Sequence, residues 1–269
     1  MTHLGELVFV GLGLNDDLGI SLRALEETKT ADHVFIELYT SFLPDFSIKR
    51  FTEMSGKTPQ TVTRKELEEK GGELILNSAL VGKTVLLVPG DPLIATTHVA
   101  LRILAEKRKI KTRIIHGSSI LSAAIGLSGL HNYKFGKSVT IPFPDETPAT
   151  TPYRVIGQNR KLGLHTLCFL DIKAEEKRQL TINDGLRELM RIEAEKKENT
   201  ILDDTIAVGV ARAGSDRPDV KAGVVKELLQ HQFGMPPHTL IFPGRLHFME
   251  VDALITLAGA PETLRRFSE

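Results

Sequence analysis

Residues 85–93, with the sequence Val-Leu-Leu-Val-Pro-Gly-Asp-Pro-Leu, constrain the fold of this chain more than any other stretch. The four apolar residues at its start predict a short strand buried on both faces, as in parallel sheets. The strand then ends, because Pro92 restricts Asp91 to extended conformations and Gly90 permits a backbone geometry closed to other residues. A helical pattern resumes at Thr96. A loop at the carboxyl end of a parallel strand is where open α/β sheets bind ligands.

The residues of this loop leave two interpretations open. In the first, the loop is a tight strand-to-helix turn in which Asp91 accepts hydrogen bonds from local backbone amides. In the second, the loop borders a small-molecule site.

The composition is that of a globular protein and argues against some functions. Of the 269 residues, 41% are hydrophobic and 25% are charged, which is ordinary for a globular domain. The formal charge of +0 argues against a nucleic-acid binder, which usually carries a basic face. No apolar run approaches the roughly 20 residues of a membrane span, and the N-terminus lacks the layout of a signal peptide. The single cysteine, Cys168, lies in an apolar run and is expected to be a buried core thiol. We therefore expect a cytoplasmic protein that contacts neither membrane nor nucleic acid.

The order of the expected elements predicts two α/β domains. The first half opens as β-α-β, whereas strands predominate after Lys137. We expect residues 1–117 to form a domain with a mainly parallel sheet and residues 118–269 to form one with a mixed sheet, because two later strands lack a crossover of helix length. Expected strands are 7–10, 33–37, 85–88, 112–115, 138–141, 164–170, 205–210 and 238–242. Expected helices are one carrying Ile20 to Leu25 and capped by one of the acids 15–17, then 64–70, 96–107, 120–127, 182–197, 221–230 and about 249–257. Residues 142–152, which hold four prolines, are expected to be a surface excursion.

The turn after the first strand carries an incomplete dinucleotide-binding motif. Gly11-Leu12-Gly13 matches its first two glycines, and Glu37 at the end of the next strand is placed to bind a ribose. However, Asp16 occupies the third glycine position, where its charge would repel a pyrophosphate at a helix N-terminus. Nicotinamide dinucleotide binding is therefore disfavoured.

Other catalytic and metal-binding signatures do not emerge from the sequence. The nine histidines include no pair at metal-ligand spacing beside a helical glutamate, and no second cysteine is present. The segment Gly126-Leu-Ser128-Gly129 misses the spacing of a nucleophile elbow. We interpret most histidines, including His98, His116 and His165, as structural or solvated. No metal site is predicted, and the catalytic residue is unknown.

Several motifs spread over nearly the whole chain resemble one family when they are taken together. They are the Pro-Gly-Asp-Pro loop with Ala95-Thr96-Thr97-His98, His116-Gly117-Ser118-Ser119-Ile120, Tyr133-Lys134-Phe135-Gly136-Lys137, Gly163-Leu164-His165-Thr166, Leu170-Asp171-Ile172, Ala211-Arg212-Ala213-Gly214-Ser215 and Pro236-Pro237-His238-Thr239-Leu240. The combination resembles the diphthine synthases, a branch of the tetrapyrrole-methylase-like family of S-adenosylmethionine-dependent methyltransferases.

The resemblance implies a fold, a reaction and a set of contacts. It implies two α/β domains with the cofactor in the cleft between them, and a homodimer. It also implies successive methylation of the amino group on a modified histidine of translation elongation factor 2, a step in diphthamide biosynthesis. The cofactor contacts carried over to matching positions are Leu12, Asp91, Ile94, Ser119, Ile120, Leu170, Ala211 and His238.

This chemistry agrees with the absence of a catalytic signature. The sulfonium of the cofactor already activates the methyl group, so the protein mainly aligns the reactants, which can supply about 7–11 kcal/mol. Beyond that, the reaction needs an acceptor for the ammonium proton. Two alternatives remain at this point: a precorrin-type tetrapyrrole methylase, and a non-enzymatic module that binds an adenosine ligand.

Overall fold

The structure is a computed structural model that describes residues 5–267. The chain divides into two compact units. The first unit runs to Ile120 and includes Lys173–Lys177, and the second comprises Leu121–Ile172 together with the chain from Arg178 onward. The predicted domain boundary between residues 117 and 118 stays a prediction.

The first unit is built on a five-stranded parallel sheet with the order β3-β2-β4-β1-β5. Its strands are β1 (Glu6–Gly11), β2 (His33–Glu37), β3 (Gln60–Val62), β4 (Lys83–Val88) and β5 (Lys111–Ile115). Because all five strands run the same way, their carboxyl ends meet at one edge of the sheet. The predicted parallel sheet is confirmed, and the Pro-Gly-Asp-Pro loop leaves β4 at this carboxyl edge.

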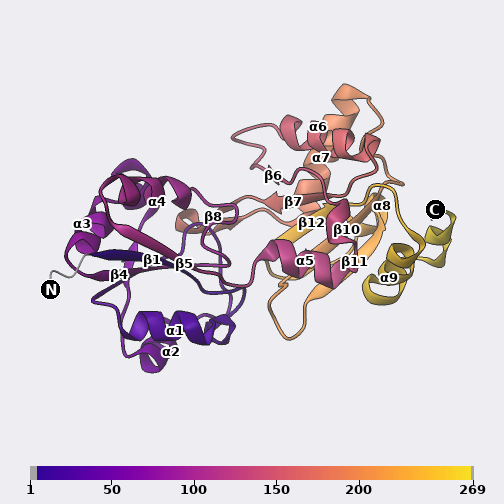
Figure 1. Ribbon diagram of the computed structural model, residues 1–269. Coiled ribbons are helices and arrows are strands. Elements are labelled where there is room, and N and C mark those ends of the chain that lie inside the picture. Colours follow the sequence, from indigo (N-terminus) through magenta and orange to yellow (C-terminus); the bar gives the residue numbers. More distant parts are fainter. Residues whose placement is uncertain (1–4, 268–269) are drawn as a thin grey trace. The chain divides into compact units, whose positions relative to one another are not determined.

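Helices cover both faces of this sheet. The helices are α1 (Leu22–Lys29), α2 (Ile48–Ser55), α3 (Glu73–Val81) and α4 (His98–Lys107). In Figure 1, α1 and α2 lie on one face, and α3 and α4 lie on the other. Side chains of β4 alternate accordingly: Val85 and Leu87 join the core cluster that contains α1 and α2, and Leu86 and Val88 join the opposite one. The central strand is thus buried on both faces, as its apolar run predicts.

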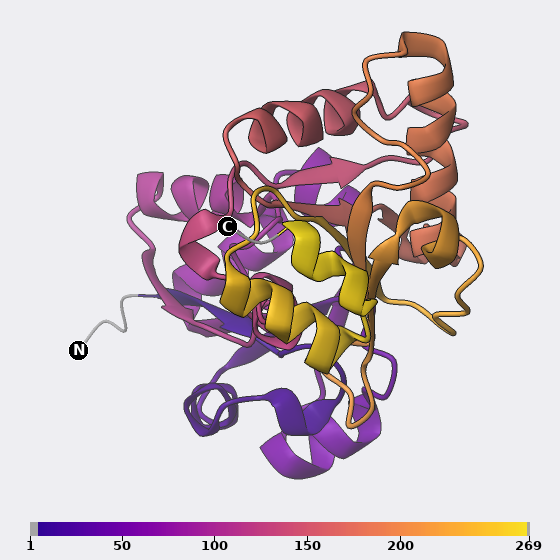
Figure 2. The same ribbon diagram turned by 90° about the vertical axis from the view of Figure 1, so that its right-hand side faces the viewer.

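The second unit holds a mixed sheet with the order β11-β10-β12-β7-β6. Its strands are β6 (Val139–Ile141), β7 (Thr166–Leu170), β10 (Ile206–Ala211), β11 (Asp219–Val224) and β12 (His238–Phe242). Only β6 and β7 among them pair in parallel, so the predicted mixed sheet is also confirmed. The helices are α5 (Ile120–Ser128), α6 (Thr150–Lys161), α7 (Ile182–Lys196), α8 (Val225–Leu228) and α9 (Phe248–Ala258). Figure 2 shows α9 and the following 3₁₀ helix, Glu262–Phe267, side by side.

One large apolar cluster fills a face of the mixed sheet. It unites side chains of α6, α7 and α8 with those of β7, β10 and β12, and Cys168 is one of its members. Cys168 is fully buried, as predicted, and burial raises the pKa of its thiol. A separate two-stranded sheet pairs β8 (Ile172–Lys173) with β9 (Arg178–Gln179).

Three local predictions are corrected by the structure. The helix expected at 221–230 is only partly present: residues 221–224 belong to strand β11, which pairs with β10, and only 225–228 are helical, as the short α8. The excursion at 142–152 ends in helix α6, which accommodates Pro152 in its first turn, where proline loses no helical hydrogen bond. Asp16 caps a 3₁₀ helix, Asp17–Gly19, whereas Ser21 caps α1. No helix among residues 5–267 is long and apolar enough to span a membrane.

Candidate functional site

Two loops at the carboxyl edge of the first sheet are joined through their backbones. The amide of Gly90 donates to the carbonyl oxygen of Gly13 at 2.7 Å, and the amide of Gly13 donates back to Gly90 at 3.2 Å. Both glycines have positive φ, 82° for Gly13 and 69° for Gly90, a region that other residues rarely adopt. The loop after β4 is therefore fixed against the loop after β1.

The loop after β5 closes onto the same point. A Cβ atom on Gly117 would lie 2.3 Å from the carbonyl oxygen of Gly90, and one on Gly11 would lie 2.5 Å from the amide nitrogen of Gly117. Since β1 lies between β4 and β5, only glycine at its end lets the two flanking loops approach each other. Three loops are thus held in one place by backbone contact.

Asp91 projects from this junction and makes two contacts. Its side chain is buried, and Oδ1 accepts a hydrogen bond from the amide of Leu93 at 3.1 Å. Its Oδ2 lies 2.7 Å from Nδ1 of His116, whose side chain is 74% exposed. The local turn contact expected in the first interpretation is present, but it uses only one carboxylate oxygen. The other oxygen holds a histidine that sequence reasoning treated as structural or solvated.

Five predicted cofactor residues follow strands at this edge, and we refer to them as the carboxyl-edge group. Leu12 follows β1 and is buried, Asp91 and Ile94 follow β4, and Ser119 and Ile120 follow β5, with Ile120 beginning α5. The structure brings this group to one edge of the first sheet.

The other three predicted residues form the second-sheet group. Ala211 ends β10 and pairs with His238, the first residue of β12. Phe169 pairs with Thr239, so Leu170 at the end of β7 lies beside His238 on the other side. All three occupy one end of the mixed sheet.

His238 carries an unused hydrogen-bonding atom. Its Nδ1 accepts from the amide of Ile182 at 3.2 Å, so the neutral ring carries its hydrogen on Nε2. That Nε2 is buried and has no hydrogen-bond partner among the described residues. Burial, together with the nearby charge of Arg212, lowers the pKa of His238 to about 4, so the ring is neutral at physiological pH. A buried donor without a partner is costly, and such an atom is a place where a ligand would bind.

The segment before His238 is held by Arg212. The guanidinium donates to the carbonyl oxygens of Phe233 at 3.0 Å and Met235 at 2.9 Å. A cis peptide bond joins Pro236 and Pro237 in the same segment. The Arg212 side chain therefore holds the backbone of the segment that leads to His238.

A small cavity of about 250 Å³ lies in the first unit beside the start of α4. Its polar lining is Tyr39, Glu68, Thr97 and His98. His98 is buried, neither ring nitrogen has a hydrogen-bond partner among the described residues, and burial lowers its pKa to about 4. Its Nε2 lies 3.6 Å from Oε1 of Glu37, at the end of β2. Glu37 is fully buried in the protein, so it is not placed as a ribose ligand.

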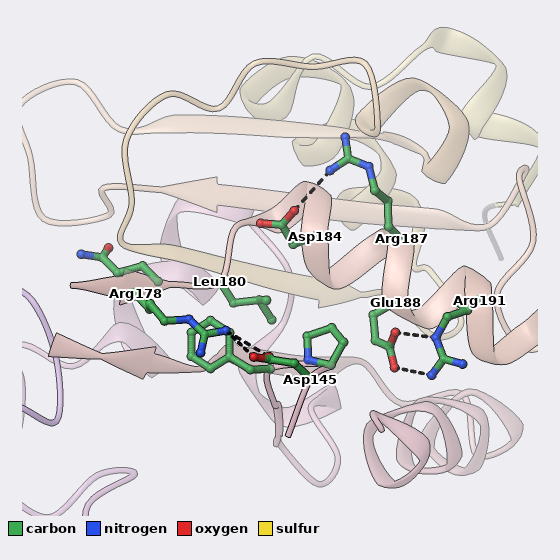
Figure 3. A pocket seen from close by; sticks show the side chains of 10 residues that line it. Asp145, Arg178, Leu180, Asp184, Arg187, Glu188 and Arg191 are labelled. Atoms are coloured by element: carbon green, nitrogen blue, oxygen red, sulfur yellow. Dashed lines mark hydrogen bonds and ion pairs between the residues drawn. The ribbon is translucent and has the colours of Figure 1, made fainter. Parts of the chain in front are cut away.

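A larger cavity of about 420 Å³ lies in the second unit, along α7 (Figure 3). Three arginines line it, and each is paired with an acid: Arg178 with Asp145 at 3.0 Å, Arg187 with Asp184 at 3.2 Å, and Arg191 with Glu188 at 2.8 Å. Figure 3 shows these pairs along the wall of the cavity. The lining is charge-balanced and includes no predicted site residue. Within residues 5–267, no cluster of three or more histidine, cysteine or acidic side chains could hold a metal ion.

Known proteins are similar to this chain over almost its entire length. The family model described as Tetrapyrrole (Corrin/Porphyrin) Methylases matches residues 6–229. The diphthine synthase of Methanosarcina mazei is 44% identical over 264 residues, covering 96% of this chain and 98% of that protein. The diphthine synthase of Methanocaldococcus jannaschii is 45% identical over 251 residues, covering 92% and 97%.

A solved structure agrees with these relatives. A crystal structure of a diphthine synthase superposes with a TM-score of 0.89 at 42% identity, covering 97% of this chain and 99% of that one. Sequence and fold thus point the same way. The chain belongs to the tetrapyrrole methylase family, within which it groups with the diphthine synthases.

Proposed function

We propose that this protein is an S-adenosylmethionine-dependent methyltransferase that successively methylates the amino group on a modified histidine of translation elongation factor 2. The relatives that support this proposal are diphthine synthases over nearly their full length. Precorrin methylation is not favoured, because the same relatives are not corrin enzymes by name. The observation in this molecule that carries the proposal is the buried, unpartnered Nε2 of His238 beside Leu170 and Ala211.

The residues present fit a cofactor of this kind. The carboxylate of Asp91 keeps free lone pairs and can accept hydrogen bonds from an ammonium or a ribose hydroxyl. Nε2 of His238 can donate to a ring nitrogen or carbonyl of the ligand, and the side chains of Leu170 and Ala211 offer apolar surface to a flat ring. We propose the carboxyl-edge group and the second-sheet group, each within its own unit, as cofactor contacts.

The protein's part in the reaction is positioning. When bound, the cofactor supplies a methyl group already activated by its sulfonium. The glycine junction of Gly11, Gly90 and Gly117 fixes the Asp91 carboxylate before any ligand arrives, and such preorganisation reduces the cost of alignment. The buried His238 donor adds a directional contact that bulk water cannot replace.

Three further properties belong to the same proposal. We propose elongation factor 2 as the protein substrate, a homodimer as the functional assembly, and the cytoplasm as the location. Their support is the family resemblance and the diphthine synthase relatives.

A thermal shift experiment tests the proposal. S-adenosylmethionine or its demethylated product should raise the melting temperature, whereas NAD should not, because Asp16 disfavours a pyrophosphate after β1. At one hundred times its dissociation constant the ligand should add about 2.7 kcal/mol of stability. Replacing His238 with Ala should reduce the shift. Unchanged melting with saturating S-adenosylmethionine, together with a clear shift from NAD, would overturn the proposal.

A further inference from the structure

The proposed reaction needs a group that accepts a proton. An alkyl ammonium has no lone pair, so it must lose a proton before its nitrogen can attack a methyl group. We propose that His116 accepts this proton at Nε2 and that Asp91 positions it. This inference rests on the proposed function and adds a catalytic residue to it.

The geometry of the Asp91–His116 pair is that of an oriented base. Asp91 is 7% exposed and is anchored by the Leu93 amide and by the backbone junction at Gly90. Its Oδ2 lies 2.7 Å from Nδ1 of His116, so Nδ1 of the neutral ring donates and Nε2 becomes the acceptor. A carboxylate that fixes the tautomer of an imidazole and stabilises its protonated form is the arrangement used by catalytic dyads and triads.

The position of His116 allows it to accept and release a proton in each successive methyl transfer. Its side chain is 74% exposed and follows β5 at the edge that carries the predicted cofactor residues. An exposed Nε2 can reach a substrate amine and can return its proton to water before the next transfer. Among the described residues, Asp91 is the charged group within ion-pair distance of this imidazole.

Other histidines are worse placed for this role. His98 and His238 are buried and have pKa values lowered to about 4, so they are weak bases. Both ring nitrogens of His165 are already hydrogen-bonded: Nδ1 accepts from the Gly244 amide, and Nε2 contacts Glu250. The closest rival is His231, whose Nε2 lies 3.0 Å from Asp219.

The His231–Asp219 pair differs from the Asp91–His116 pair in the burial of its carboxylate, in the exposure of its histidine and in the ring nitrogen that faces the acid. The Asp219 side chain is 30% exposed, against 7% for Asp91. A more exposed carboxylate interacts with its partner through a higher effective dielectric and therefore orients and stabilises an imidazolium less well. His231 is the rival that the experiment must exclude.

The proposed step moves one proton and one methyl group. An N–H bond of the ammonium breaks, its electron pair stays on nitrogen, and the proton goes to Nε2 of His116. The nitrogen lone pair then forms the new N–C bond while the C–S bond breaks, and that pair of electrons goes to sulfur. Sulfur becomes a neutral thioether. Each methyl transfer releases one proton, which His116 passes to solvent.

The experiment compares His116→Gln with two matched histidine variants. His231→Gln tests the alternative base. His33→Gln removes a histidine at the start of β2, at the amino-terminal ends of the parallel strands and away from His116. Isothermal titration should give His116→Gln a cofactor dissociation constant within about threefold of the parent's. Its methylation rate near neutral pH should fall roughly 10²- to 10⁴-fold, as expected for loss of a general base. The deficit should shrink as pH rises, because more of the amine is then already neutral. His231→Gln and His33→Gln should keep the parent's profile.

A second readout does not depend on activity. Nitrogen-15 NMR of the parent should find the His116 ring with its hydrogen on Nδ1, and Asp91→Ala should abolish that preference. A ring protonated on Nε2 in the parent would overturn the inference. So would a His116→Gln rate and pH profile equal to the parent's, loss of cofactor affinity in that variant, or loss of rate in His231→Gln instead. A parent that methylates nothing would overturn the proposed function itself, whereas an active parent with an equally active His116→Gln would overturn this inference alone.

Discussion

Two buried glutamates show how the balance between burial and hydrogen-bonding neighbours decides the pKa of a carboxyl group. Burial alone would raise the pKa of both. For Glu250 the hydrogen bond from Lys134, with others from backbone amides and His165, outweighs burial, and the pKa falls from 4.5 to about 2. For Glu37 burial outweighs the hydrogen bonds from Thr40 and Tyr39, and the pKa rises from 4.5 to about 7.

The two glutamates should therefore affect stability in opposite pH ranges. Glu250 holds less proton in the folded state, so its contribution is present above pH 4.5 and is lost as the pH falls toward 2. Glu37 holds more proton when folded, so stability declines as the pH rises from 4.5 through about 7. Each effect is on the order of 3 kcal/mol, from 1.36 kcal/mol per unit of pKa.

Urea unfolding of three variants between pH 3 and pH 8 checks both effects. Glu250→Gln should destabilise the protein at pH 7 and flatten the acid side of the profile. Glu37→Gln should remove the decline toward pH 8. The exposed Glu262→Gln serves as the control and should reproduce the parent curve. Identical profiles for the parent and both buried variants would contradict the assigned pKa directions.

A third residue-scale prediction concerns Asp91. Asp91→Ala would remove the charged hydrogen bond that we propose Asp91 makes to the cofactor, which typically contributes about 1.5–3 kcal/mol, so cofactor binding should weaken roughly ten- to a hundredfold. Loss of the Leu93 turn contact should cost only about 1 kcal/mol of folding stability. Asp32→Ala is the matched control, because Asp32 accepts the Lys83 amide at the other edge of the sheet. An Asp91→Ala protein that is destabilised but binds cofactor like the parent would return Asp91 to a purely structural role.

The eight predicted site residues and His116 mark what the sequence can reveal about this site. The eight were carried over from the family resemblance, whose motifs are short stretches of contiguous residues. In the structure, these residues lie at one end of each sheet. Whether they contact a cofactor stays a prediction. His116 was missed because its partner Asp91 is 25 residues away in the chain. Their contact depends on the sheet order β4-β1-β5 and on the close approach of the loops at Gly11. Neither can be predicted from the spacing of residues along the sequence.

At the scale of elements, the strands were predicted more accurately than the helices. The strands of the first sheet are continuous apolar runs buried on both faces, which leave a clear pattern. Residues 221–224 were misassigned to a helix, whereas their pairing with β10 makes them a strand. Helix α6 was not predicted because a proline-rich segment argues against a helix, although Pro152 lies in the first turn of α6, where proline is tolerated. Strand β3 and helices α2 and α3 also went unpredicted.

The glycine junction gives an element-scale prediction. Gly117→Ala should push the loops after β4 and β5 apart, because the new Cβ would lie 2.3 Å from a backbone oxygen that cannot rotate away. We expect a loss of about 1–3 kcal/mol or more, as for overpacking, and weaker cofactor binding. Gly126→Ala, in α5 with nothing within 4 Å of the new Cβ, should instead stabilise the protein by up to about 1 kcal/mol. Equal stability and affinity of Gly117→Ala and the parent would contradict the packing argument.

At the scale of the whole molecule, the parallel sheet and the mixed sheet carry different kinds of candidate ligand contact. The parallel sheet places three loops and a paired carboxylate at its carboxyl edge, and the mixed sheet presents a buried histidine donor between two apolar residues. Each arrangement follows from strand direction and register within its own unit. The fold class could be predicted because strand runs and crossover lengths are local properties of the chain.

The central claim is the reaction, and mass spectrometry of the substrate tests it most directly. Elongation factor 2 that carries the modified histidine would be incubated with this protein and S-adenosylmethionine, then digested and analysed. The account predicts methyl groups on the added amino nitrogen of that residue, and none on factor with an unmodified histidine. Absence of methylation on the modified factor, or methylation of the unmodified factor at a comparable rate, would contradict it.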